Sequence, residues 1–334
     1  MKTNTKLFIL AASAALMTAC ASEKTEEPQS PAAARITAGV SGPKSRAVDN
    51  KWNADRIGVM AVDATGTSTT MGNKYKNVGY ATTSTGGIAD FTPITVGGGI
   101  FFEDAFLDFT FAAYAPYAAS TNDATLPGTD GKIDVNTGNQ PTATDQEKID
   151  YIYAFGAVAN KNNPTISFTD NTAAGGSDCS FKHRMARLIF NIQVSNTDGF
   201  ADAGVLENAD YTLGGLIHEG TFDVTTGIAA AAGSAVSDWS LRDNCVAQFD
   251  AATGVMTISM ILLPQTLADN LRFAVSPDDG EHQTYYNNDV IKPALEAGYS
   301  YTYTITVKKT GLIISGSTIE DWNDGGSYSG DAMM

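Results

Sequence analysis

The stretch "YTYTITV" at residues 301–307 decides the fold class. Its larger, mostly apolar side chains fall on every second residue, and a threonine stands between each pair. A period of two places alternate side chains on opposite faces of an extended chain. The stretch therefore predicts a β-strand with one buried face, which Tyr301, Tyr303, Ile305 and Val307 form.

The same alternation recurs at "RLIFNIQV" (187–194) and at "RITAGV" (35–40), where Ile36, Ala38 and Val40 share one face. Glycine, serine and aspartate cluster between such runs, as in "DATGTST" (63–69), and these residues favour turns. No long amphipathic helix interrupts them. Short strands separated by turns predict an all-β protein built from β-sandwiches.

A small, polar and Gly-rich segment, "TDNTAAGGSD" (169–178), separates two strand-like runs. We expect a domain boundary there, because linkers between domains have this composition. The predicted domains are an N-terminal β-sandwich at 34–175 and a C-terminal β-sandwich at 176–327, followed by a tail at 328–334.

The amino-terminal segment resembles a bacterial lipoprotein signal peptide. Lys2 and Lys6 precede an apolar run of about a dozen residues, which is too short to span a bilayer. Small residues and Cys20 follow, as at a lipoprotein processing site. We expect a signal peptide at 1–19, acylation (palmitate) of Cys20 and an acidic linker at 20–33; the alternative is ordinary secretion with a chance cysteine.

The formal net charge of −16 argues against nucleic-acid partners, because phosphate binding needs clustered lysines and arginines. Cys179 and Cys245 could pair after export, but sequence does not set the distance between them. The choice between a disulfide and two buried thiols stays open.

Motifs for catalysis and for cofactor binding are missing from the sequence. It has no HExxH, no GxSxG and no phosphate-binding loop, and its three histidines lie far apart. The acidic stretch "DGKIDVNTGN" (130–139) lacks the order of a calcium-binding loop. We therefore expect no enzyme activity, no catalytic residues, no cofactor and no metal site.

Several segments in succession resemble the fimbrillin family, the type V pilins and Mfa-like fimbrial lipoproteins of anaerobic gut and oral bacteria. They are "SRA" (45–47), "WNADRIGVMAV" (52–62), "FAAYAPY" (111–117), "FKHRMARLIFNI" (181–192), "ILLPQTL" (261–267) and "YTYTITVKKTGLIISGSTIEDW" (301–322). The resemblance implies two transthyretin-like β-sandwiches in a fimbrial subunit that supports adhesion.

The resemblance also implies a location and a route of assembly. The precursor would be lipid-anchored in the outer membrane and exposed at the surface. A protease would cut after Arg46, making Ala47 the new amino terminus. The strand carrying Ile36, Ala38 and Val40 would then leave, and a strand of another fimbrial subunit would take its place.

Alternatives remain at each of these positions. Arg46 could be a plain turn residue, and Arg35 and Arg56 are rival cleavage sites. The donor strand could be the 311–319 region, or the protein could be a tip or anchor subunit rather than a stalk subunit. The processing protease and the host or bacterial surface ligand are not specified by the sequence.

A second function class is a surface glycan-binding lipoprotein of a nutrient uptake system. Exposed aromatic side chains would then form a sugar-binding platform, and Trp239, Tyr285 and Tyr286 are the candidates. The two hypotheses differ in what they require. A fimbrial subunit needs residues 34–40 buried as a strand, whereas a glycan binder needs several aromatic rings on one exposed face.

Overall fold

The computed structural model describes residues 30–40, 52–62, 69–105, 107–266, 271–281, 283–291, 294–322 and 327–328. The predicted signal peptide, Cys20, Arg46 and Ala47 lie outside the described residues. The chain from Pro31 onward clusters into one compact unit.

The predicted all-β fold is confirmed, because strands dominate the described chain. The strands up to residue 168 are β1 (Ala32–Ala33), β2 (Arg35–Gly39), β3 (Arg56–Val62), β4 (Val78–Ala81), β5 (Ile88–Pro93), β6 (Phe101–Phe102), β7 (Phe109–Ala115), β8 (Lys132–Asn136), β9 (Ile152–Ala159) and β10 (Thr165–Phe168).

The later strands are β11 (Lys182–His183), β12 (Ala186–Val194), β13 (Asp210–Gly214), β14 (Glu219–Asp223), β15 (Ile228–Ala231), β16 (Trp239–Ser240), β17 (Val246–Asp250), β18 (Val255–Leu262), β19 (Gln265–Thr266), β20 (Leu271–Ser276), β21 (Tyr285–Ile291), β22 (Ala294–Leu295), β23 (Tyr299–Lys308), β24 (Gly311–Asp321) and β25 (Ser327–Tyr328). The described helices are short: α1 (Thr69–Lys74), α2 (Ala143–Ile149), α3 (Leu241–Asn244) and 3-10 turns at Thr172–Ala174 and Ala203–Leu206. None of these helices has the length and apolar character needed to cross a bilayer.

The first hydrophobic core lies against an eight-stranded sheet of order β10-β2-β5-β4-β3-β7-β9-β11. Side chains from both halves of this sheet belong to one cluster, including Ile36 and Phe168 from one half and Phe111 and Ile152 from the other. The sheet therefore wraps around its core in the manner of a sandwich. This wrapping places β2 against the buried interior.

The second hydrophobic core lies between two sheets. One has the order β17-β18-β12-β23-β24-β25 and the other β16-β13-β20-β21. The two strongest alternating stretches, 187–194 and 301–307, lie in β12 and β23, which pair in parallel. Leu188 and Tyr303 are among the buried residues on their shared face. The one-sided burial predicted from the alternation is thus present in both strands.

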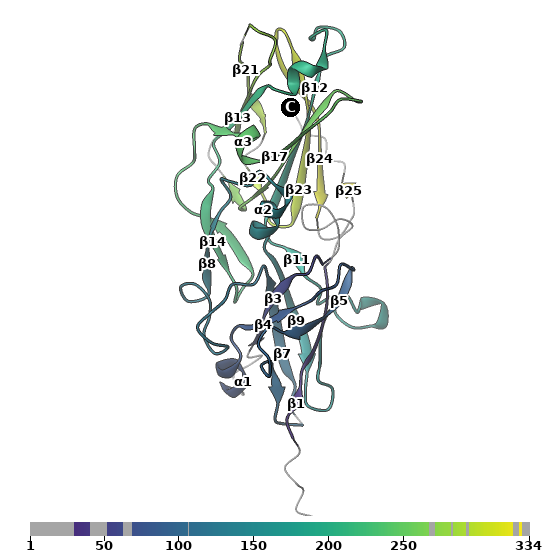
Figure 1. Cartoon of the computed structure of the whole chain (residues 1–334), viewed down its shortest axis with the longest axis vertical. Helices are drawn as coiled ribbons and strands as arrows, with labels where there is room; N and C mark the ends of the chain where they lie inside the picture. Colours follow the sequence, from purple (N-terminus) through teal and green to yellow (C-terminus); the bar gives the residue numbers. More distant parts are fainter. Residues whose placement is uncertain are drawn as a thin grey trace, which may run out of the picture. The chain divides into compact units, whose positions relative to one another are not determined.

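A third cluster joins the two halves of the chain. Strand β8, from the first half, pairs antiparallel with β14, from the second, and β15 completes this small sheet (Figure 1). Tyr151 stacks on Phe222 across the same junction, with ring centroids 4.5 Å apart. The halves on either side of the predicted boundary therefore share both a sheet and a hydrophobic core.

Two glutamines reinforce this junction by bonding to the backbone of β18. Gln140, fully buried, donates to Ile261 O at 2.7 Å and accepts from Ile261 N at 2.7 Å. Gln146, on α2, donates to Gln140 Oε1 at 3.1 Å and to Ser259 O at 2.7 Å. Because an amide side chain both donates and accepts, it can bridge to the backbone of a distant strand in this way.

The structure shows the state of the two cysteines and the ends of the predicted linker and tail. Cys179 belongs to the first core and Cys245 to the second, and both thiols are free. Burial raises the pKa of each thiol, as expected for inert, structural cysteines. The predicted linker ends in β1, and Ser327–Tyr328, where the tail was expected to start, forms β25.

His218 is a buried titratable group at the same junction. Its Nδ1 lies 3.0 Å from Thr137 Oγ1, and its ring packs 4.2 Å from the Trp239 ring. Burial lowers the pKa of His218 to about 4 from its usual value near 6.5. The folded protein therefore contains this imidazole in its neutral form at physiological pH.

We predict that replacing Gln140 with alanine destabilises the chain by about 3–5 kcal/mol, because Ile261 N–H and C=O would be left buried without a partner. Urea unfolding at pH 7 measures this change. Gln248→Ala is the matched control, since Gln248 is exposed on β17, and it should change stability by about 0.5 kcal/mol or less. Equal effects of the two substitutions would contradict the proposed role of the glutamine bridge.

We predict that acidification destabilises the protein through His218. Its folded-state pKa lies below its unfolded-state value, so the stability that it contributes is present above pH 6.5 and is lost as the pH falls toward 4. The loss attributable to this group is about 2–3 kcal/mol. Urea unfolding at pH 7 and pH 4.5 should therefore show a larger drop for the wild type than for His218→Gln, and parallel curves for the two proteins would contradict it.

Candidate functional site

Strand β2 is an interior strand of the first sheet. It pairs in parallel with β10, from Arg35 opposite Thr165 to Ala38 opposite Phe168, and antiparallel with β5 on its other edge. An interior strand satisfies the backbone donors and acceptors of both of its neighbours. Removing β2 would therefore expose two strand edges at once.

The pairing continues beyond both ends of β2. Upstream, β1 pairs antiparallel with β6, and Ala34 N donates to Ile100 O at 2.8 Å. Downstream, Phe181 N donates to Gly39 O at 2.9 Å, and Val40 forms a bridge with Phe181. Residues 32–40 are thus bonded to the rest of the fold along their whole length.

The three side chains predicted to fill the core do so to different degrees. Ile36 is 2% exposed and Ala38 is 0% exposed, and both belong to the first hydrophobic cluster. Val40 is half-buried and packs against the same cluster. On the opposite face, Thr37 Oγ1 donates to Asp90 Oδ1 of β5 at 2.8 Å. The alternating residues of "RITAGV" therefore point in turn to the core and to the surface of the sheet.

Trp52 follows the segment 41–51, which lies outside the described residues, and it contacts the end of β2. It is fully buried, and its Nε1–H donates to Ala38 O at 2.9 Å. Its ring makes edge-to-face contacts with Phe91 at 5.0 Å and with Phe181 at 5.3 Å between centroids. Trp52 N also donates to Gly86 O at 3.0 Å. The indole is thus fixed between β2, β5 and the segment before β11.

Sequence reasoning missed this role of Trp52 at the end of β2. The signal that could have found it is its position, six residues beyond the predicted cleavage point. It also missed β10 as the partner of β2, because parallel pairing across more than a hundred residues leaves no local pattern.

The rival cleavage sites have hydrogen-bonded backbones. Arg35 N donates to Pro164 O at 2.8 Å, and Arg35 begins β2. Arg56 begins β3, pairs with Ala81 of β4, and accepts from Tyr117 N at 3.2 Å. A protease needs an extended, unpaired segment, so both arginines are protected in the folded chain.

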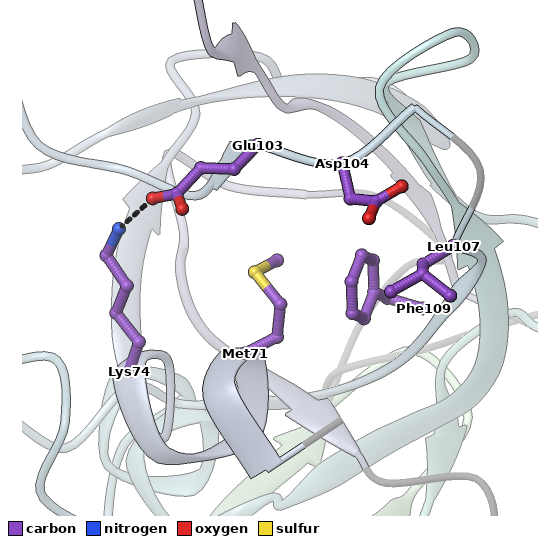
Figure 2. A pocket seen from close by; sticks show the side chains of 6 residues that line it. All are labelled: Met71, Lys74, Glu103, Asp104, Leu107 and Phe109. Atoms are coloured by element: carbon purple, nitrogen blue, oxygen red, sulfur yellow. Dashed lines mark hydrogen bonds and ion pairs between the residues drawn. The ribbon is translucent and has the colours of Figure 1, made fainter. Parts of the chain in front are cut away.

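A cavity of about 310 Å³ lies beside α1. Figure 2 shows Met71 and Phe109 in its apolar part, with Leu107 beside them and Asp104 at the rim. Lys74 and Glu103 also line it, and they form an ion pair at 3.2 Å. Both charged side chains are largely exposed, so the pair contributes little to stability.

The aromatic platform of the glycan-binding alternative is not assembled. Trp239 is 6% exposed and donates its indole N–H to Gly138 O at 2.9 Å, and Tyr285 is 7% exposed. Tyr286 is 51% exposed, with the Arg272 guanidinium 4.3 Å from its ring centre. Trp52 and Trp322 are also buried. A stacking surface needs several exposed rings together, and of these five side chains Tyr286 alone is exposed.

His183, on strand β11, is a buried structural histidine. Its Nδ1 lies 2.9 Å from Asp150 Oδ1, and its ring stacks on Trp322 at 3.8 Å between centroids. Within the described ranges, no group of three or more His, Cys, Asp or Glu side chains is placed to hold a metal ion.

Comparison with known proteins identifies the family of the chain. Residues 45–322 match the sequence family described as "Fimbrillin-like". The chain belongs to the fimbrillin-like family. The Bacteroides uniformis protein "Putative fimbrium subunit Fim1C" is 25% identical over 295 residues, which covers 86% of this chain and 85% of that protein.

Two solved structures of cell-adhesion proteins share the fold. A "putative cell adhesion protein" from Bacteroides ovatus is 26% identical, with a TM-score of 0.68, covering 88% of this chain and 99% of that chain. Another from Bacteroides uniformis is 23% identical, with a TM-score of 0.64, covering 87% of this chain and 99% of that chain. The second likeness shows the fold alone.

Membership of this family confirms the resemblance seen in the sequence. It also confirms that the protein is a fimbrial or adhesion subunit of the cell surface rather than an enzyme. Its expected partners are other fimbrial subunits.

We predict that Ile36→Ala destabilises the first core by about 2–4 kcal/mol, because it removes a fully packed side chain and leaves a cavity. Denaturant unfolding, followed by tryptophan fluorescence, measures the change. Ile88→Ala on the adjacent strand is the matched control, since Ile88 is 66% exposed, and its effect should stay within about 0.5 kcal/mol. A loss at Ile36 no larger than at Ile88 would show that β2 does not fill the core.

Proposed function

We propose that this fimbrillin-like protein is made as a surface lipoprotein and is built into a fimbria by protease-triggered strand exchange. The observation that carries the proposal is the placement of β2. It is an interior strand with two buried side chains, and it is joined to the next described strand through residues 41–51.

The amino-terminal segment would provide the membrane anchor. Residues 1–19 would act as the signal peptide, and acyl chains on Cys20 would hold the precursor in the outer membrane. Each buried CH₂ contributes about 0.8 kcal/mol, so several chains give a firm anchor. The remaining residues of the linker at 20–33 would space the folded protein from the membrane, and β1 would form its end.

Cleavage after Arg46 would make Ala47 the new amino terminus and cut the covalent link between β2 and β3. The segment 20–46 carries both the lipidated cysteine and β2, so one cut would release the subunit from the membrane and free the strand to leave. The family match begins at Ser45, next to this position, which fits a subunit whose shared part starts there.

Departure of β2 would open a groove between β5 and β10. The groove would expose the backbone edges of both strands and the apolar pocket that Ile36 fills, which is an unstable state for a sheet protein in water. A strand from another subunit could pair with the exposed backbone edges and fill the apolar pocket. A well-buried aliphatic side chain contributes about 1.5–3 kcal/mol, and the two ladders of hydrogen bonds add to it.

The incoming strand would have to match the direction of β2, antiparallel to β5 and parallel to β10. A donor role for the 311–319 region would require β24 to separate from β23, with which it pairs from Gly311 to Asp321. A tip or anchor subunit would use the groove without donating β24.

We also propose that the chain keeps the predicted division into two sandwiches, at about 34–175 and 176–327, with the boundary displaced by a few residues. The first core is built from residues between Ile36 and Phe181, and the second from residues between Ala186 and Val307. Because β11 also belongs to the first sheet, this separation supports a boundary near residue 184, with the two sandwiches tied together by the junction of β8 and β14.

We predict that mild treatment of the purified full-length precursor with an arginine-specific protease, which spares Lys44 and Lys51, produces a new amino terminus at Ala47. Amino-terminal sequencing identifies the cut. Arg46→Gln should prevent it, whereas Arg35→Gln should leave it unchanged, because Arg35 is protected by pairing. After cleavage, oligomer ladders should form with wild-type protein and be absent with Arg46→Gln.

Two outcomes would contradict the proposal. The first is cleavage after Arg35 or Arg56 while residues 41–51 stay intact. The second is a cut after Arg46 after which the strand fragment remains bound and no oligomer forms, even in the presence of other fimbrial subunits.

A further inference from the structure

Trp52 and Ala38 lie on opposite sides of the proposed cleavage site after Arg46, yet a hydrogen bond joins them. The indole N–H of Trp52 donates to Ala38 O at 2.9 Å. Cleavage after Arg46 would leave Trp52 on the mature subunit, while Ala38 would depart with its strand. Trp52 is therefore a part of the groove that contacts whatever strand occupies it.

The groove has a different amount of space at successive positions. Ile36 occupies a pocket for a large aliphatic side chain and is 2% exposed. Ala38 is 0% exposed, and the core around it contains Trp52 and Phe181. In a close-packed core, added methylene groups force neighbouring side chains out of place.

The next position is also narrow. A Cβ on Gly39 would lie 3.3 Å from Ile88 Cγ1 and 3.6 Å from Gly87 O. The first distance is slightly short, so the exposed Ile88 side chain would have to move by a few tenths of an ångström, and the second is an ordinary contact. Positions 36 to 39 thus favour, in order, a branched aliphatic residue, a residue that faces Asp90, a very small residue, and glycine or another small residue.

We propose that Trp52 determines which strands this groove accepts and in which register. Its indole N–H bonds to the backbone carbonyl of the residue at the Ala38 position, and its ring limits that residue to alanine, serine or glycine. The partner is therefore a subunit strand of the order Ile/Val/Leu-x-small, followed by glycine or another small residue. This inference rests on the proposed strand exchange and specifies the chemistry of the partner strand.

The register follows from the spacing of the pockets. A slip of one residue would turn the core side chains of an incoming strand to the surface. A slip of two residues would place a side chain such as Ile36 or Val40 where Ala38 fits. The indole N–H donates to the carbonyl at the Ala38 position, so it favours the same register as the packing does.

Strand uptake by the full-length protein cleaved with an arginine-specific protease tests the proposal. The probe is a fluorescent peptide of residues 30–46, and the readouts are its binding affinity and its release rate. Trp52→Phe removes the indole N–H while keeping an aromatic ring. Trp239→Phe is the matched control, because Trp239 is also buried and its indole N–H also donates to a carbonyl, at 2.9 Å, but outside the groove.

We predict that Trp52→Phe speeds release of the peptide about tenfold, because one buried hydrogen bond to the strand is lost, and that Trp239→Phe changes it less than about twofold. With wild-type protein, a peptide carrying Ala38→Gly, which removes one methyl group, should bind within about fivefold of the native peptide. Peptides carrying Ala38→Leu or Ile36→Ser should bind at least about tenfold more weakly.

The failures of the two proposals are distinguishable. Uptake of all peptides with equal affinity, or equal release from the Trp52→Phe and Trp239→Phe proteins, would overturn the role of Trp52 and leave strand exchange standing. No uptake of any peptide by cleaved wild-type protein would overturn strand exchange, and the role of Trp52 with it. Thermal unfolding of each uncleaved variant checks that the fold is intact before the comparison.

Discussion

The first sheet depends on one constraint: the backbone groups along a buried strand edge need hydrogen-bonding partners. Strand β2 pairs in parallel with β10 and antiparallel with β5, so it supplies partners to both strand edges. Its Ile36 and Ala38 side chains are buried in the hydrophobic core on one face of the sheet. Unpaired backbone groups at a buried edge are costly, so the sheet is complete only while some strand lies in this place. Nothing in that requirement specifies which chain the strand belongs to.

The junction between the halves explains how a strand could leave without loss of the whole fold. The third cluster, the pairing of β8 with β14 and the glutamine bridges to β18 do not include β2. The second core likewise draws on residues from Ala186 onward. Departure of β2 would therefore expose the first core and leave the other two clusters intact. The subunit could then stay folded while it exposes an apolar groove to a partner strand.

Sequence patterns could predict the parts of the fold that one-sided burial dictates locally. The alternation in β2, β12 and β23 follows directly from one face being in the core, and it was readable in "RITAGV", "RLIFNIQV" and "YTYTITV". The pairing of β2 with β10 and of β8 with β14 was not readable, because each joins segments far apart in the chain. The bond from Trp52 to Ala38 depends on both the sheet order and the path of the intervening chain, and neither has a local signature. For the same reason, the composition of the sequence did not predict the junction of β8 with β14 or the roles of Gln140 and Phe222 in it.

A covalent link alone can keep such a strand in place against competitors. While residues 41–51 join β2 to β3, any opening of the groove is followed by return of the same strand, since a tethered segment acts at an effective concentration of about millimolar or above. Once the link is cut, the subunit is no longer tethered to the lipid-anchored strand, and a strand of another subunit can compete for the groove through the same kinds of contact. The cut thus changes none of the hydrogen bonds or packing that hold β2, yet it decides whether exchange proceeds. Selection among competing strands then falls to the groove itself, to the pocket of Ile36, the tight space at Ala38 and Gly39, and the indole of Trp52.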